Sequence, residues 1–413
     1  MPVSATLAVD FGTSNSAAAM LEQGTLRRIA LEPGAETLPT AVFFPEEGGA
    51  MRIGSAAAEA LIAGEDGRYM RALKSVLGTP LFHEKRLIAK RRRTLAEIVT
   101  AFLVEVKTRA EAQTGRAFDR VLSGRPVHFH SSDTARDAAA LADLRGCYEA
   151  AGFAEVEFLY EPEAAARSCQ EADRPGELGL VVDIGGGTSD FSVFRAAPEG
   201  IEILASHGIR LGGTDFDRSV SLSHAMPLLG LGSQLRRPLG EGLLPVPNAL
   251  YVDLATWAMI PFLYTADTLR AARDMKRHAV EPEKFARLVS VLEDELGHEL
   301  AFAVERGKIA ANSGTPGAAI EMGVIERGLA APLTAGALAA ALTEAGEQLR
   351  HAMYETLHRA QVTPMQIGAV VLVGGSSLMR LVADEARAVC PGARLRRSEA
   401  FTAVIDGLAL ATA

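Results

Sequence analysis

A short pattern occurs twice in the chain, and it constrains the fold more than any other feature. The first copy begins at Leu7 and reads Leu-Ala-Val-Asp-Phe-Gly-Thr-Ser-Asn-Ser; the second begins at Leu180 and reads Leu-Val-Val-Asp-Ile-Gly-Gly-Gly-Thr-Ser. Their aspartates, Asp10 and Asp183, are 173 positions apart in a chain of 413 residues. A repeat close to half the chain predicts two halves with the same architecture.

Each copy has the pattern of a tight strand–turn–strand unit. An apolar run ends in aspartate, a turn rich in Gly, Thr and Ser follows, and a second run then alternates between apolar and polar residues. In each half we expect three hairpin-linked strands, an insertion, and then strand, helix, strand and helix. The later elements are expected at 120–127, 134–151, 156–160 and from 161 in the first half, and at 367–373, 378–389, 394–397 and 402–411 in the second.

These elements predict an α/β protein of two lobes. Lobe I is expected to comprise residues 1–172 and the C-terminal helix 399–413, with a polar, helix-prone insertion at about 33–118. Lobe II is expected to comprise residues 173–398, with an insertion at about 224–364.

The glycine-rich turns do not match the two common phosphate-binding loops. A dinucleotide-binding loop is followed at once by a helix, whereas Asp190-Phe-Ser-Val-Phe alternates like a strand. The pair Gly307-Lys308 lacks the upstream glycine and the hydroxyl residue of a P-loop. Two turns with bare glycine backbones could instead direct several N–H groups at a polyphosphate, with Asp10 and Asp183 holding Mg²⁺ largely through waters. Ordinary hairpins with Asx-type turns are the alternative.

Composition and charge limit the partners of the chain. With 42 basic and 51 acidic residues the formal charge is −9, so extensive nucleic-acid binding is unlikely. Three widely spaced cysteines, Cys147, Cys169 and Cys390, suggest a reducing cytoplasm. The N-terminus does not read as a signal peptide, and no stretch is apolar enough to predict a membrane span.

Five further motifs accompany the repeat and carry a family resemblance. They are Ala72-Leu-Lys-Ser-Val-Leu-Gly, Glu161-Pro-Glu-Ala-Ala-Ala, Leu211-Gly-Gly-Thr-Asp-Phe-Asp, Glu305-Arg-Gly-Lys and Val371-Leu-Val-Gly-Gly-Ser-Ser. With the two turns, the chain resembles the actin-like ATPases, whose duplicated lobes are ribonuclease H-like and have a nucleotide cleft between them. Within that superfamily it resembles the ATPase domain of the Hsp70 (DnaK) chaperones. Arg125-Pro-Val, in place of the usual Val-Pro-Ala, is similar to the short YegD-like branch.

The resemblance implies roles for particular residues. It implies a catalytic set in which Asp10 and Asp183 surround the metal and the water, Lys74 reaches the γ-phosphate, Glu161 orients water and metal, and Asp190 is an acidic partner across the cleft. It implies that Pro126 relays the nucleotide state to a partner domain. The residues implied to bind ATP or ADP are Gly12, Thr13, Ser14, Asn15, Gly185, Gly186, Gly187, Thr188, Gly212, Gly213, Glu305, Lys308, Ile309, Gly374, Gly375, Ser376 and Leu378.

Two of these positions depart from the family pattern. The chaperones have arginines where this chain has Ile309 and Leu378, so both cations that flank the adenine are replaced by aliphatic side chains. Loss of cation–π contacts of about 0.5–2 kcal/mol each predicts modest nucleotide affinity or looser base choice. The chaperones also continue into an acidic-apolar linker and a peptide-binding domain, and no such linker is visible here.

The sequence favours an ATP-binding, slowly hydrolysing chaperone-like protein, with a protein client or co-chaperone as a possible partner. A filament-forming actin-like protein and a small-molecule kinase of the same superfamily are the alternatives, because a fold does not decide a function. One motif stands apart from all three. The basic run that ends in Lys90-Arg-Arg-Arg could contact nucleic acid or an acidic partner, but a solvated helix face in the insertion is the simpler interpretation.

Overall fold

The computed structural model describes residues 5–88, 90–130, 133–168, 176–197, 200–237, 240–397 and 402–413. The chain forms two compact units: unit 1 contains residues 1–210, 349–378 and 382–413, and unit 2 contains residues 211–348 and 379–381. The lobe boundaries expected at 172/173 and 398/399, and also Cys169, lie outside the described residues. Cys147 and Cys390 are buried free thiols.

Unit 1 contains two large sheets with equivalent topology. In the first, the strand order is β11-β10-β1-β2-β3, and the short β4 also pairs with β2. In the second, the order is β14-β13-β12-β19-β20. The strands are β1 (Thr6–Phe11), β2 (Asn15–Glu22), β3 (Thr25–Ile29), β4 (Leu38–Pro39), β10 (Arg120–Arg125), β11 (Glu155–Tyr160), β12 (Leu178–Ile184), β13 (Ser189–Ala197), β14 (Gly200–Ile209), β19 (Ile367–Val373) and β20 (Arg394–Arg397).

The pairing pattern of these two sheets is also the same. β1 is antiparallel to β2 and parallel to β10, just as β12 is antiparallel to β13 and parallel to β19. The central strands β1, β12 and β19 are almost entirely buried, which explains their near-continuous apolar sequences. The strands predicted at 367–373 and 394–397 are confirmed, and those predicted at 120–127 and 156–160 shift by at most two residues at their ends.

The helices of unit 1 begin where the sequence supplies caps. The long helix α2 (Leu95–Thr114) starts with a capping box between Thr94 and Glu97 and ends at Gly115, whose φ of 68° suits glycine. In α3 (Thr134–Ala150), the carboxylate of Asp133 accepts a hydrogen bond from the N–H of Arg136. The other helices are α1 (Ser55–Ile62), α4 (Glu161–Ser168), α12 (Arg380–Val389) and α13 (Ala403–Leu410).

The insertion at 33–118 is less helical than expected. Besides α1 and α2 it contains a three-stranded sheet, β6-β5-β7, with strands Arg52–Ile53, Ala41–Pro45 and Gly67–Arg71. It also contains the hairpin β8 (Arg86–Ile88) and β9 (Arg91–Arg93) and two 3₁₀ turns, η1 (Leu73–Val76) and η2 (Pro80–His83). The basic run therefore lies on a β-hairpin, and the prediction of a helix face there is wrong. Strand pairing outweighed the helix propensity of its lysines and arginines.

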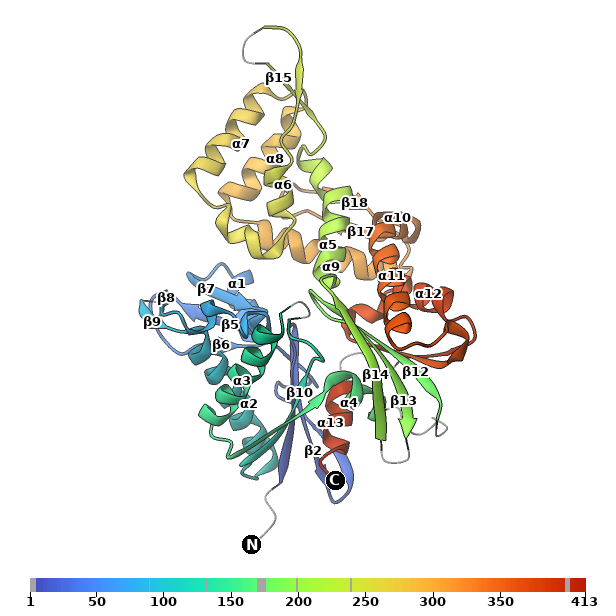
Figure 1. Ribbon diagram of the computed structural model, residues 1–413. Helices are drawn as coiled ribbons and strands as arrows, with labels where there is room; N and C mark the ends of the chain where they lie inside the picture. Colours follow the sequence, from blue (N-terminus) through green and yellow to red (C-terminus); the bar gives the residue numbers. More distant parts are fainter. Residues whose placement is uncertain are drawn as a thin grey trace. The chain divides into compact units, whose positions relative to one another are not determined.

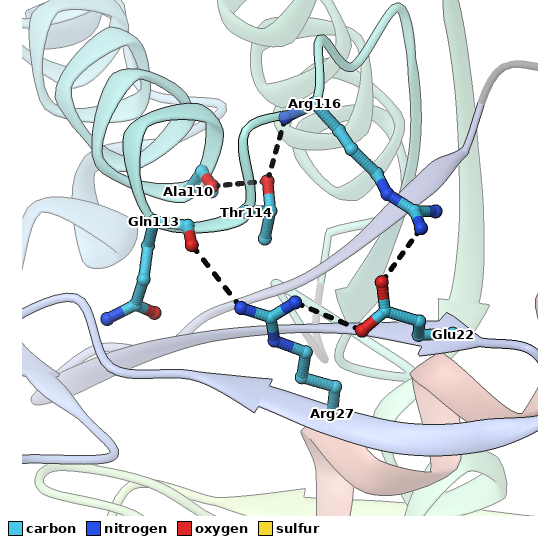
Figure 2. A network of polar contacts seen from close by, with 6 residues as sticks. All are labelled: Glu22, Arg27, Ala110, Gln113, Thr114 and Arg116. Carbon is cyan, nitrogen blue, oxygen red and sulfur yellow. Dashed lines mark hydrogen bonds and ion pairs between the residues drawn. The ribbon is translucent and has the colours of Figure 1, made fainter.

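Hydrogen bonds and ion pairs connect the C-terminal end of α2 to the hairpin of β2 and β3 (Figure 2). Arg27 donates to a carboxylate oxygen of Glu22 and to the carbonyl of Gln113, at 3.0 and 3.3 Å. Arg116, just past the helix, donates to the other oxygen of Glu22 at 2.7 Å. Because all these groups are partly exposed, we expect each ion pair to contribute less than about 1 kcal/mol.

The helices α4 and α13 pack directly against each other within unit 1 (Figure 1). They belong to one apolar cluster that contains residues of both sheets, among them Ala8, Val181 and Val371. The closest approach is at Gly407 of α13, where a Cβ atom would lie 1.7 Å from the carbonyl oxygen of Ala164 in α4. Glycine is therefore required at this helix crossing.

Unit 2 is mainly helical. Its helices are α5 (Gly213–Val220), α6 (Ala249–Leu254), α7 (Ala266–His278), α8 (Pro282–Glu293), α9 (Gly297–Ser313), α10 (Ala335–Ala341) and the first part of α11 (Thr343–Arg359). Two small hairpins accompany them: β15 (Gln234–Arg236) with β16 (Leu243–Pro245), and β17 (Ala319–Glu321) with β18 (Ala330–Pro332).

We expect Gly407→Ala to destabilise the protein by roughly 2–3 kcal/mol, because the added methyl group cannot fit between α13 and α4. Gly146→Ala in α3 is the matched control. Nothing lies within 4 Å of a Cβ atom at Gly146, so the higher helix propensity of alanine should raise the free energy of unfolding of this variant by about 0.5–1 kcal/mol. Urea unfolding of both variants measures the difference, and equal stabilities would contradict the close contact.

Candidate functional site

The two repeated turns lie between paired strands of unit 1. Residues 12–14 connect β1 to β2, and residues 185–188 connect β12 to β13. A Cβ atom at Gly12 would lie 2.2 Å from the carbonyl oxygen of Asn15, so the first turn is too tight for another residue. In the second turn the N–H of Gly185 donates to the carbonyl of Thr188 at 2.9 Å.

The two turns and the loop after β19 meet at one place. A Cβ atom at Gly186 would lie 2.3 Å from the hydroxyl oxygen of Ser14, so the turns touch each other. The hydroxyl of Ser376 donates to the carbonyl of Gly185 at 3.2 Å. Gly374 has a φ of 82°, and a Cβ atom there would lie 2.7 Å from a carboxylate oxygen of Asp183. Three glycine-rich loops thus surround one site.

Carboxylates end the central strands at this site. Asp10 lies near the end of β1 and Asp183 near the end of β12. Asp190 is the direct partner of Asp183 in the β12–β13 register. It therefore lies on the neighbouring strand beside Asp183, because the short turn brings the two residues opposite each other.

Lys74 and Glu161 form a buried ion pair at the same site. The Nζ atom of Lys74 lies 2.5 Å from a carboxylate oxygen of Glu161, and the two side chains are 8% and 14% exposed. Lys74 is on the 3₁₀ turn η1, which follows Ala72 with a φ of 56°. Glu161 is the first residue of α4, directly after β11. A lysine and a glutamate 87 positions apart are thereby held together.

The carboxylates of the site repel one another electrostatically. Burial and the charges of Glu161 and Asp190 raise the pKa of Asp183 to about 8. Burial and Glu161 raise the pKa of Asp190 to about 7. The pKa of Asp10 is raised for the same reasons, although Lys74 opposes the shift. Burial lowers the pKa of Lys74, but Glu161 and Asp10 outweigh it and the pKa is raised.

This excess of negative charge fits a divalent cation. Four carboxylates (Asp10, Glu161, Asp183 and Asp190) act on one another around the single cation of Lys74. Within the described residues, no three His, Cys, Asp or Glu side chains are grouped to hold a metal ion directly. Mg²⁺ does not need such a group, because it keeps several waters and takes one or two carboxylates. Asp10 and Asp183 are the candidates for this role.

The remaining candidate residues lie in unit 2. Gly212 precedes α5, and its N–H donates to the carboxylate of Asp215 at 2.9 Å. Lys308 of α9 is buried and lies 2.8 Å from the carboxylate of Asp217 in α5, whereas Glu305 and Ile309 are exposed. Asp217 was not among the predicted site residues, although it stands in the same motif as Gly212 and Gly213.

The structure therefore gathers one part of the predicted set within unit 1. The residues that it connects are Asp10, Gly12, Ser14, Asn15, Lys74, Glu161, Asp183, Gly185, Gly186, Thr188, Asp190, Gly374 and Ser376. Thr13, Gly187, Gly375 and Leu378 belong to unit 1 as well, in the two turns and the 3₁₀ turn η8 (Gly375–Leu378), but no contact described above involves them. Gly212, Gly213, Glu305, Lys308 and Ile309 belong to unit 2.

The geometry defines a mixed α/β protein with glycine-rich turns and carboxylates around one buried lysine. A family model, the Hsp70 protein model, matches residues 6–226, which is just over half of the chain. The chain belongs to the Hsp70 family. The match includes both turns, Lys74, Glu161 and Gly213 but not the motifs that begin at Glu305 and Val371. In the part of the chain that the structure describes, no helix is both long and apolar enough to cross a bilayer.

The raised pKa values predict how ligand-free stability depends on pH. Because the folded state keeps protons on Asp183 and Asp190 that the unfolded state loses near pH 4, stability should fall as pH rises from about 4 to about 8. We expect Asp183→Asn to make this fall smaller. The variant should have a free energy of unfolding about 1–3 kcal/mol higher than that of the parent chain at pH 8, but nearly the same at pH 4. Thermal unfolding in EDTA across this range is the measurement. A variant that follows the same pH profile as the parent chain would contradict it.

Proposed function

We propose that the chain binds ATP with Mg²⁺ and hydrolyses it slowly, as a nucleotide-gated, chaperone-like protein of the Hsp70 family. The observation that carries this proposal is the contact of three glycine-rich loops beside four carboxylates and one buried lysine. Glycine turns offer backbone N–H groups to phosphate oxygens. The carboxylates provide the negative charge that a Mg²⁺–nucleotide complex requires, since the cation neutralises charge on the transferring phosphoryl group.

The architecture supports an actin-like interpretation of this site. The two sheets of unit 1 share strand order and pairing pattern, and the equivalent strands β1 and β12 each carry one repeated aspartate, Asp10 or Asp183, next to their last residue. We interpret the sheets as the cores of two duplicated lobes, with insertions that differ in size and structure. The equivalent turns of the two copies would then bind the phosphates from two sides.

The residues of the site would have distinct tasks. Asp10 and Asp183 would hold the hydrated metal ion, and Glu161 would orient water while it keeps Lys74 in place. Lys74, fixed by its ion pair, would direct its ammonium group at charge that develops on the γ-phosphate. Asp190, beside Asp183, would accept a proton or orient water at the end of the strand. In unit 2, Gly212, Gly213, Glu305 and Lys308 would contact the nucleoside.

The family also suggests partners and a place in the cell. A protein client or co-chaperone would respond to the nucleotide state, with Pro126 after β10 as part of the relay. The buried free thiols of Cys147 and Cys390 are compatible with a reducing cytoplasm. We assign the chain to the YegD-like branch because of Arg125-Pro-Val.

Phosphate release tests the proposal against its two rivals. Slow, Mg²⁺-dependent release from ATP alone is expected for a chaperone-like switch. Release that requires an added sugar would indicate a small-molecule kinase. Nucleotide-dependent pelleting in the ultracentrifuge would indicate a filament-forming protein.

We expect Lys74→Ala to lower kcat by roughly 10²–10³-fold with little change in ATP affinity, because its ammonium acts mainly on the transferring phosphoryl group. Lys284→Ala is the control for removing a lysine from an ion pair, since Lys284 lies 2.6 Å from Glu281 at a more exposed position in unit 2. Single-turnover hydrolysis and calorimetric ATP titration separate the two effects. Unchanged turnover in Lys74→Ala with intact binding would remove Lys74 from the catalytic set.

We expect arginines at both Ile309 and Leu378 to tighten ATP binding by up to a few kcal/mol, if each arginine restores a cation–π contact with the base. Ile309 and Leu378 are 54% and 43% exposed, so each position can accept a longer side chain without disturbing a core. Calorimetric titration of the double variant is the measurement. Unchanged or weaker binding would mean that the base is bound elsewhere.

A further inference from the structure

The hairpin of β8 and β9 is an isolated basic surface that the proposed ATPase does not use. Six of the ten residues from 84 to 93 are basic and only Glu84 is acidic, in a chain whose net charge is −9. The two strands pair only with each other in the part of the chain that the structure describes (Figure 1). Among the described residues, this segment forms one side-chain ion pair, the exposed one between Arg86 and Glu84.

The register of the hairpin brings like charges together. Arg86 lies directly opposite Arg93, and opposing like charges destabilise a strand pair. Arg91 and Arg93 are two positions apart, so their side chains leave the same face of β9, about 7 Å apart. This arrangement is unfavourable for an isolated hairpin and favourable once an anion lies between the two guanidinium groups.

Arg93 has an unpaired buried donor at this face. Its Nε atom is buried and has no hydrogen-bond partner among the residues that the structure describes, while its guanidinium group lies 5.1 Å from the ring centre of Phe44. A buried donor without an acceptor costs about 1–3 kcal/mol. A small cavity of about 30 Å³ adjoins it, lined by Arg91, Arg93, Phe44, Pro45, Gly48 and Gly49. That volume holds roughly two water molecules, or one carboxylate group.

We propose that this hairpin is a docking surface for an acidic segment of a partner protein, with one carboxylate seated in the cavity between Arg91 and Arg93. A Glu or Asp side chain can enter a recess of this size because its carboxylate is the end of a flexible chain. A nucleic-acid phosphodiester cannot, because it is flanked by sugars on both sides. The outer face of the hairpin carries Leu87, 68% exposed, opposite Arg92, which offers a contact for an apolar residue among the acidic ones.

Fluorescence anisotropy tests the proposal. The probe is a labelled 12-residue peptide of glutamates with a leucine at every third position, in 0.15 M salt. Comparison probes are the same peptide with glutamine in place of glutamate, a 12-nucleotide RNA and a 12-base-pair DNA. Arg91→Glu changes an exposed residue, and Arg93→Met keeps the aliphatic contact with Phe44. Arg270→Glu, on an arginine that is 76% exposed in α7, is the control for net charge.

We expect the acidic peptide to bind saturably with a Kd below about 1 mM. Each hairpin variant should raise this Kd at least tenfold, whereas Arg270→Glu should change it less than twofold. Equal weakening by Arg270→Glu, equal binding of the glutamine peptide, or no binding of the acidic peptide would overturn the proposal. Tighter, hairpin-dependent binding of RNA or DNA would also overturn it, in favour of a nucleic-acid surface. Circular dichroism of each variant shows whether it is folded.

Discussion

The close packing of α13 on α4 is the constraint on which the rest of unit 1 depends. These helices contact each other at Gly407 and Ala164, so tightly that no side chain fits at the crossing. They share one apolar cluster with strands of both sheets. Glu161 begins α4, and Gly124 of β10 leaves room for its side chain, since a Cβ atom there would lie 3.2 Å from the Cγ atom of Glu161. The crossing thereby fixes the carboxylate that holds Lys74.

The site combines this rigid support with unbalanced charge. Burial and mutual repulsion raise the pKa values of Asp10, Asp183 and Asp190, whereas Lys74 is held charged by the same groups. A protein loses stability by keeping several carboxylates together without enough cations. Such a loss of stability is expected at a site that binds a cation together with a ligand, because their binding to the folded state stabilises it. The contact of Ser14 with Gly186 brings the two glycine-rich turns together at this site.

The basic hairpin also carries unbalanced charge, but this charge is positive, whereas that of the first site is negative. Arg86, Arg91 and Arg93 share a face of two short strands, and one buried donor among them is unpaired. Neither site therefore balances its charge with its own side chains: the carboxylate site lacks a cation, and the hairpin lacks an anion. The basic run is visible in the sequence but was predicted to lie on a helix, because Arg86–Ile88 and Arg91–Arg93 are only three residues long and do not alternate between apolar and polar residues.

The sequence by itself determined the repeat, the strand–turn–strand units, most later strands and helices, and the residue types of the site. These follow from local patterns, because apolar periodicity and glycine-rich turns act over a few residues. Only the tertiary structure decided that Lys74 pairs with Glu161, that Asp190 lies beside Asp183, that Lys308 pairs with Asp217, and that the insertion contains a three-stranded sheet. These contacts depend on strand register and on packing between residues far apart in the chain, and neither is encoded in any short segment.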